Sequence, residues 1–282
     1  MNCSNVCCWR FSFVSALSIA SVLFLAGCNI EATPTNMTAP KLASVSAQDL
    51  QAVSKKKIFF GHQSVGYDIV RGVSDVLKQY PSIALNVEES ADPKVFDAPV
   101  LAHTTLGQNS DPGSKIRDFA ERVRGGIGDR ADVAAFKFCY IDFDRNTDVP
   151  QVFAMYKSTM ADLAKEYPRT RFLHVTVPLK ATSMGWKTYI NNMRGKPHPF
   201  IADNVRREEF NRLIRSEYAG RQPFFDLAAI EATRADGSNS SDVSNGQRIP
   251  SLAIEYTRDS GHLNERGRKF VAEQFLGLLA SL

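Results

Sequence analysis

The sequence has little cysteine in the region expected to fold. Five cysteines occur among the 282 residues, and four of them lie within the first 28, which leaves only Cys139 in the rest of the chain. A disulfide framework needs paired cysteines, and zinc fingers and iron–sulfur sites need several close together. All three kinds of site are therefore excluded for the folded part.

Concentrated charge is also absent. Lys and Arg total 34 against 30 Asp and Glu, and the densest basic cluster is the lysine triplet at 55–57. Nucleic-acid-binding proteins present a concentrated basic face, so no nucleic-acid partner is expected. A hydrophobic content of 44% with 23% charged residues is typical of a globular protein, and the length suits one α/β domain or two smaller ones.

The histidines lack a metal-binding spacing. His103, His174 and His198 share no H-x-x-x-H pattern, so neither a metal nor another cofactor is expected. His174 lies in an apolar run that is typical of a buried strand, where we expect a hydrogen-bonded core histidine.

The longest apolar run is too short to span a membrane. It covers 16 residues, from 11 to 26, whereas a spanning helix needs about 20, and it is typical of a secretory signal. The run ends in Leu-Ala-Gly-Cys at 25–28, which resembles the lipobox of bacterial lipoproteins. This resemblance implies cleavage before Cys28 and lipid attachment there; an ordinary signal peptide or an uncleaved anchor is the alternative.

These features divide the chain into three parts. Residues 1–27 are expected to be the signal peptide, 28–48 a flexible tether rich in Thr, Ala, Pro and Ser, and 49–282 one folded domain. The lipobox resemblance implies a protein anchored in the bacterial cell envelope through Cys28. The lipobox resemblance also implies lipoprotein sorting, in which Asn29, the residue after Cys28, favours the outer membrane. The anchored protein would then face the periplasm.

Strand and helix patterns alternate in the folded part. Periodicity predicts strands at 57–60, 83–88, 133–141, 171–177 and 224–227, and helices at 64–80, 114–124, 150–166, 204–218 and from 265 onwards. Residues 100–112 and 235–250 are polar or glycine-containing and are predicted to be loops. Such alternation predicts a three-layer α/β/α sandwich around a mostly parallel, about five-stranded, flavodoxin-like sheet.

Ligands of such sheets bind beyond the carboxyl ends of the strands. Residues 61–66, Gly-His-Gln-Ser-Val-Gly, connect the first strand to the first helix. A serine there is exposed at the sheet edge beside unpaired helix N–H groups, which suits a nucleophile; a plain helix N-cap is the alternative for Ser64.

A second candidate segment precedes the last helix. Residues 259–264 read Asp-Ser-Gly-His-Leu-Asn. Asp259 three residues before His262 can hold the imidazole as a general base requires. The alternative is a surface turn before the last helix, for which Asn264 is the expected N-cap.

Together, the two segments resemble the SGNH/GDSL hydrolases, which are α/β/α serine esterases with an Asp-x-x-His pattern in their last block. The resemblance extends in layout from about residue 58 to the C-terminus. It implies Ser64 as nucleophile, His262 as base and Asp259 as the orienting acid. The alternative α/β-hydrolase elbow, G-x-S-x-G, does not match, because position 62 is His.

The oxyanion hole is where the sequence departs from this family. The family's second block supplies a glycine N–H, for which Gly107 is the best candidate. The third block should carry an Asn after the central strand, and none is present there. Asn109 is our hypothesis for the missing donor, while His62 and Asp142 are candidates to line the site; packing of His62 and a structural role for Asp142 are the alternatives.

The expected function is a cell-envelope serine esterase that cleaves an acyl ester, such as an acetyl ester, of a small molecule or polysaccharide. An O-acyltransferase with the same triad is one alternative. A non-catalytic lipoprotein that binds a polysaccharide or a partner protein is the other, because a fold does not fix a function.

Overall fold

The computed structural model describes residues 44–182 and 199–282. The predicted signal segment, Cys28, most of the tether and His198 lie outside these ranges. The described chain begins with α1 (Ala47–Val53), whose N-cap Ser46 forms a capping box with Asp49. None of the described helices is long and apolar enough to cross a membrane.

The central sheet has six parallel strands in the order β2-β3-β1-β4-β5-β6. Without the edge strand β2, this order is that of a flavodoxin-like sheet, as the sequence predicts. The sixth strand is one more than expected. The strands are β1 (Lys57–His62), β2 (Val87–Glu89), β3 (Val100–Thr105), β4 (Val133–Phe136), β5 (Arg171–Val175) and β6 (Phe224–Phe225).

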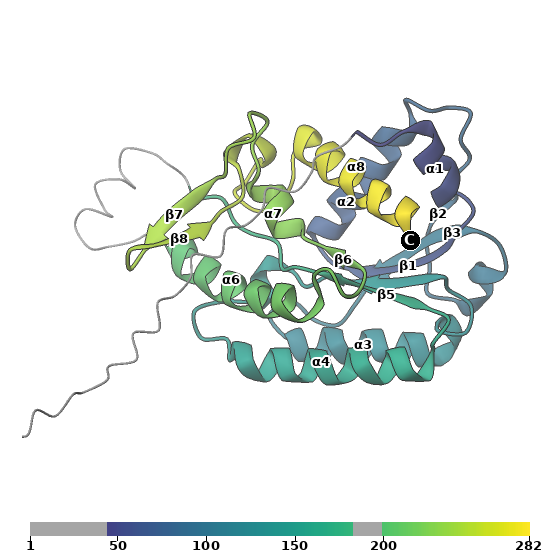
Figure 1. The fold of residues 1–282 in the computed structure, drawn as a ribbon, viewed down its shortest axis with the longest axis horizontal. Helices are drawn as coiled ribbons and strands as arrows, with labels where there is room; N and C mark the ends of the chain where they lie inside the picture. Colours follow the sequence, from purple (N-terminus) through teal and green to yellow (C-terminus); the bar gives the residue numbers. More distant parts are fainter. Residues whose placement is uncertain (1–43, 183–198) are drawn as a thin grey trace, which may run out of the picture. The chain divides into compact units, whose positions relative to one another are not determined.

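Helices cover both faces of the sheet (Figure 1). One face packs against α1, α2, α7 and α8, and the other against α3, α4 and α6. The helices that follow α1 are α2 (Val65–Leu77), α3 (Pro112–Arg122), α4 (Val149–Glu166), α6 (Pro199–Tyr218), α7 (Leu227–Ala232) and α8 (Glu265–Ser281). Shorter helical turns lie at Pro93–Asp97, Val123–Ile127, Tyr140–Asp142 and Ile254–Tyr256.

The central strands are buried on both faces. In β1, Ile58 and Phe60 enter the core beneath α2 and α8, whereas Phe59 enters the opposite core beneath α3. This double burial explains why β1 is a nearly continuous apolar run rather than an alternating one.

Two segments predicted to be loops contain strands. Residues 100–105 form β3, which lies between β2 and β1 and is therefore buried, including His103. Residues 241–250 form a hairpin of β7 (Ser241–Ser244) and β8 (Gln247–Pro250). Its turn residues Asn245 and Gly246 both have positive φ, of 49° and 76°, as a two-residue hairpin turn requires.

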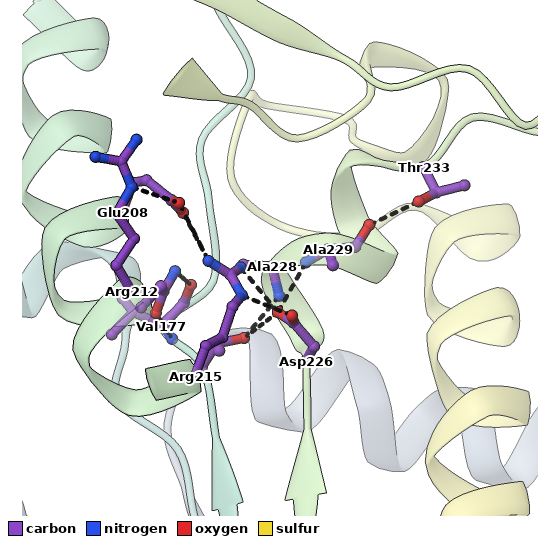
Figure 2. Close-up of polar contacts among 10 residues, drawn as sticks. Val177, Glu208, Arg212, Arg215, Asp226, Ala228, Ala229 and Thr233 are labelled. Carbon is purple, nitrogen blue, oxygen red and sulfur yellow. Dashed lines mark hydrogen bonds and ion pairs between the residues drawn. The ribbon is translucent and has the colours of Figure 1, made fainter. Parts of the chain in front are cut away.

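A polar cluster attaches α6 to the start of α7 (Figure 2). Arg215 of α6 donates two hydrogen bonds to Asp226, of 2.7 and 2.9 Å, and also contacts both carboxylate oxygens of Glu208 at 3.1 Å. Asp226 in turn caps α7 by accepting the N–H of Ala229. These partly buried ion pairs hold α6 against the segment that connects β6 to α7, at the carboxyl end of the sheet.

Candidate functional site

The site lies where the strand order reverses. β1 has β3 on one side and β4 on the other, and the loop after β1 leads directly into α2. Crevices of parallel sheets form at the carboxyl ends of the strands at such a point. Ser64 occupies the junction between β1 and α2.

Ser64 does not act as a capping side chain. Its φ of 52° and ψ of −107° are unusual for a residue other than glycine, and its side chain makes no capping hydrogen bond to the helix. The hydroxyl lies 2.8 Å from Nε2 of His262 instead. Strained backbone of this kind is concentrated at functional sites, because the surrounding structure must maintain it.

His262 connects Ser64 to Asp259. The Nδ1 atom of His262 lies 2.6 Å from an Asp259 carboxylate oxygen, and the other carboxylate oxygen accepts the N–H groups of Gly261 and His262. Because the carboxylate only accepts, the imidazole proton is on Nδ1 and Nε2 is free to accept from Ser64. The structure thus brings the three predicted residues into one hydrogen-bonded chain.

The charge on Asp259 is well stabilised. Partial burial acts to raise the pKa of this carboxyl, but the hydrogen bonds from His262 and Gly261 outweigh it and lower the pKa to about 2. Side chains of His262 and Asp259 remain 33% and 48% exposed. The chain of hydrogen bonds is therefore accessible to water and to a ligand from solution.

The loop that carries His262 is fixed to the helix that follows Ser64. Buried Asp68, in the first turn of α2, accepts the N–H of Leu263 at 3.1 Å and contacts Arg258 at 3.3 Å. On the other side, Ala181 donates its N–H to the carbonyl of Ser260 at 2.9 Å. Asp68 was not among the predicted site residues, because its partners are about 190 positions away.

Gly107 is not available as an oxyanion donor, contrary to the expectation. Its N–H is donated to Asp118 at 2.9 Å, and it has a positive φ of 51°. Asn109 is exposed, and its side-chain oxygen accepts from Lys115 at 3.1 Å. The carbonyls of Leu106 and Gly107 accept from the side chain of Gln63, so this loop supports the segment before Ser64.

Asp142 is structural, which makes its expected role in lining the site wrong. It pairs with Lys115 at 2.6 Å, and both side chains are essentially inaccessible. Its carboxylate also accepts the N–H groups of Ser110 and Cys139. A buried carboxylate with this many partners fixes the loop after β3 to the turn after β4.

His62 packs in the interior, so the expectation that it lines the site is also wrong. It is fully buried, and its Nε2 lies 3.1 Å from Nδ1 of His103. A Cβ on Gly66 would lie only 2.3 Å from the His62 side chain, which shows how closely α2 covers it. Burial, with the nearby Lys137 ammonium, lowers the pKa of His62 to about 2, so the ring is neutral.

The interpretation of His174 as a core residue is confirmed. It is buried, with hydrogen bonds to Tyr156 and Gln222 of 2.8 Å each, and it stacks on Tyr218. Within residues 44–182 and 199–282, no three His, Cys, Asp or Glu side chains are grouped as metal ligands.

Tyr140 belongs to the site and was not predicted. It lies in the helical turn Tyr140–Asp142 that follows β4, and a Cβ on Gly261, the neighbour of His262, would lie only 2.9 Å from its ring. The ring also packs edge-on against His262, with 5.8 Å between centroids. The available signal was position, because residues after the central strand meet those after β1 at one sheet edge.

Comparison with known proteins finds likeness in three dimensions only. No family model matches the chain, and no curated protein matches it. A protein named as a platelet activating factor from Streptococcus pneumoniae shares 14% identity over 79% of this chain and 82% of its own, with a TM-score of 0.46.

Two further solved structures are similar in the same way. A protein named as a GDSL-like lipase from Parabacteroides merdae gives 12% identity and a TM-score of 0.45 over 80% of this chain and 96% of its own. The periplasmic domain of a lipopolysaccharide acetyltransferase from Salmonella Paratyphi A gives 16% and 0.41 over 81% and 87%. The neighbours include proteins named for the GDSL family that the motifs resemble, and at these identities the likeness is one of fold.

Proposed function

We propose that the protein is a serine-dependent acyl-ester hydrolase, with Ser64 as the nucleophile, His262 as the general base and Asp259 as the orienting carboxylate. The observation that carries this proposal is the continuous chain of hydrogen bonds from Asp259 through His262 to Ser64. A non-catalytic binding protein would have no need to hold Ser64 in an unfavourable backbone conformation with its hydroxyl directed at a histidine.

The geometry supports the following first step. Ser64 Oγ attacks the ester carbonyl while its proton moves to Nε2 of His262. The imidazolium that forms is stabilised by the Asp259 carboxylate at 2.6 Å. The oxygen that gains negative charge would lie at the N-terminus of α2, where the helix dipole favours an anion. The N–H groups of Gly66 and Tyr67 are already donated to the carbonyls of Gln63 and Ser64, so the N–H groups of Ser64 and Val65 are the proposed backbone donors.

The tetrahedral intermediate then collapses. The alcohol leaves with the proton held on His262, and an acyl group remains bonded to Ser64. Water loses a proton to His262 as it attacks the acyl carbonyl, and Ser64 regains its hydrogen when the carboxylic acid is released. The partial exposure of His262 allows water to reach this intermediate.

The proposal also covers the class of substrate. The open site accepts an ester on a small molecule or on a polysaccharide, and the lipobox segment suggests action at the cell envelope. An alcohol in place of water would make the same acyl-enzyme an acyltransferase intermediate, so acceptor alcohols belong in the assay.

Hydrolysis of p-nitrophenyl acetate tests the proposal. Ser64→Ala and His262→Ala are each expected to lower kcat by about 10⁴-fold or more, as in other enzymes that depend on such a unit. Ser74→Ala is the matched control, because Ser74 lies in the same helix α2 and its hydroxyl donates to the carbonyl of Val70 within that helix. Equal activity in Ser64→Ala and Ser74→Ala would contradict the proposed nucleophile.

A further inference from the structure

Lys180 lies one aromatic ring away from His262. Its ammonium is 4.9 Å from the centroid of the Tyr140 ring, and that ring packs edge-on against His262 with 5.8 Å between centroids. The next residue, Ala181, donates its N–H to the carbonyl of Ser260 at 2.9 Å, so this segment runs beside the loop that carries His262. Lys180, Tyr140 and His262 are all partly exposed. A ligand beside the imidazole can therefore extend across Tyr140 to the ammonium.

Buried groups fix the position of Lys180. The side chain of Asn204, fully buried in α6, binds the Lys180 backbone twice: its oxygen accepts the N–H at 3.1 Å, and its amide donates to the carbonyl at 2.8 Å. The same oxygen accepts from buried Arg207 at 2.7 Å, and Arg207 donates to the carbonyl of Tyr140 at 2.8 Å. The lysine and the aromatic ring are thus held in one framework.

The Lys180 ammonium contacts aromatic rings rather than carboxylates. Besides Tyr140 it lies over the Phe200 ring, 3.8 Å from the centroid. Within residues 44–182 and 199–282 it donates no hydrogen bond and forms no ion pair, and other charges act on it only from a distance. Two rings cover part of its hydration shell, so its N–H groups are available to an acceptor on a ligand.

The surrounding charges favour an anion at this place. The Arg207 guanidinium lies 6.0 Å from the centroid of the Tyr140 ring and is 2% exposed, and its ion-pair partner Asp203 is 4.0 Å away and is shared with Arg145. Burial is the main cause that lowers the pKa of Lys180, and the charge of Arg207 adds to it. A bound anion acts in the opposite direction, so this ammonium gains from pairing with one.

The chemistry indicates which part of an ester lies on this side. In the proposed reaction the alcohol leaves with the proton held on His262, so its oxygen must lie beside the imidazole as the ester bond breaks. The acyl group stays on Ser64. The alcohol part is therefore the part of the substrate nearest to Tyr140 and Lys180.

We propose that Lys180 is a specificity-determining residue, which binds a carboxylate or phosphate group on the alcohol part of the ester. This inference rests on the proposed function and names its substrate class. The ammonium donates a charge-assisted hydrogen bond to the anionic oxygen and takes no part in the proton transfers at His262. Acidic sugars, hydroxy acids and phosphorylated alcohols carry such a group.

The test measures kcat/KM of the full chain for meta- and para-acetoxybenzoate and for the neutral carboxamide analogues of both. Lys180→Gln is expected to lower the ratio of anionic to neutral kcat/KM about tenfold, as for loss of one hydrogen bond to a charged group, and Lys180→Arg should retain most of the ratio. Lys78→Gln is the matched control and should keep it, because Lys78 lies at the far end of α2 and pairs there with Asp75 at 3.0 Å.

Two further measurements on the wild type need no variant. Raising the NaCl concentration should lower the ratio, because salt screens charges that are partly exposed, and a ratio independent of NaCl would contradict recognition by charge. Para-acetoxyphenyl phosphate distinguishes the two anions: a higher kcat/KM than for para-acetoxybenzoate would assign a phosphate-bearing alcohol, and a lower one a carboxylate.

The outcomes separate this inference from the proposed function. The same ratio in the wild type and Lys180→Gln would overturn the inference alone. A lower melting temperature of Lys180→Gln with the ratio kept would also overturn it, since Lys180 would then only pack between the rings. A folded wild type that hydrolyses none of these esters, p-nitrophenyl acetate included, would instead overturn the proposed function and the inference with it.

Discussion

The Oγ atom of Ser64 and the Nε2 atom of His262 lie 2.8 Å apart although 198 positions separate them in the chain. Two segments near opposite ends of the domain's sequence, the β1–α2 junction and the loop before α8, create this contact. The extensive packing of α2 against α8 in one core brings those ends together. The proposed chemistry therefore depends on that helix pair as much as on the three polar side chains.

Replacing Asp259 by Asn should reduce kcat by about 10⁴-fold, because the amide no longer holds the proton on Nδ1 of His262. The pKa of Asp259 is about 2, so its carboxylate stays charged across the neutral range and the defect should be similar at about pH 6 and pH 8. Ester hydrolysis at both pH values measures it. An Asp259→Asn variant with near-wild-type kcat would show that another group orients His262.

Asp68 should act as a positioning residue. Asp68→Ala leaves the buried N–H of Leu263 without its acceptor, which costs about 1–3 kcal/mol of unfolding free energy, and frees the loop that carries His262. We expect a lower kcat together with a larger KM, measured beside the melting temperature. Asp75→Ala is the control, since Asp75 lies in the same helix and pairs with Arg268 away from Ser64. Unchanged kinetics in Asp68→Ala would contradict the positioning role.

Lys115 and Asp142 should matter for stability. Both side chains are buried, so Asp142→Asn leaves a charged ammonium with too few partners and should lower the unfolding free energy by about 3–5 kcal/mol. Glu217→Gln, which removes the partner of Lys157 in a partly exposed ion pair, should cost at most about 1 kcal/mol. Urea unfolding measures both losses of unfolding free energy. Equal losses in the two variants would show that the buried Lys115–Asp142 pair matters no more for stability than a partly exposed pair.

Much of the fold follows from local pattern, and the exceptions have physical causes. Buried parallel strands are continuous apolar runs, and β1, β4 and β5 stand out for that reason. β3 was missed because the glycine and polar residues that follow it dominate the segment. The β7–β8 hairpin was also missed, although Asn245-Gly246 is the strongest two-residue hairpin signal in the chain.

The site residues also differ in how far the sequence could predict them. Ser64, His262 and Asp259 lie in short motifs whose residue types suggest their chemistry. Whether an N–H is free is a property of the folded chain, and the occupation of the Gly107 N–H by Asp118 cannot be read from spacing. Tyr140 likewise gains its place only when the carboxyl ends of β1 and β4 meet.

Glu231 should make stability depend on pH. It is fully buried, and one of its carboxylate oxygens accepts the N–H of Leu179 at 2.7 Å. Burial is the main cause that raises its pKa from about 4.5 to about 8, against the opposing effect of this hydrogen bond and of Lys137 and Arg207. The folded state holds a proton that the unfolded state releases above pH 4.5 or so.

The contribution of Glu231 is therefore full below about pH 4.5 and falls as the pH rises toward 8, by at most about 1.4 kcal/mol per pH unit. Glu231→Gln should flatten this part of the stability profile, whereas Glu121→Gln, at an exposed position, should leave it unchanged. Urea midpoints between about pH 5 and pH 8 measure the slope. An identical slope in wild type and Glu231→Gln would assign it to other groups.

Labelling with a fluorophosphonate probe tests the central claim most directly, because the probe reacts much faster with an activated serine than with an ordinary hydroxyl. The protein, Ser64→Ala and His262→Ala would be treated together, and the adduct located by peptide mass. The account predicts phosphonylation of Ser64 in the wild type and its loss in both variants. Labelling of another residue, or none of the folded wild type when small and large probes are both used, would contradict an activated nucleophile at Ser64.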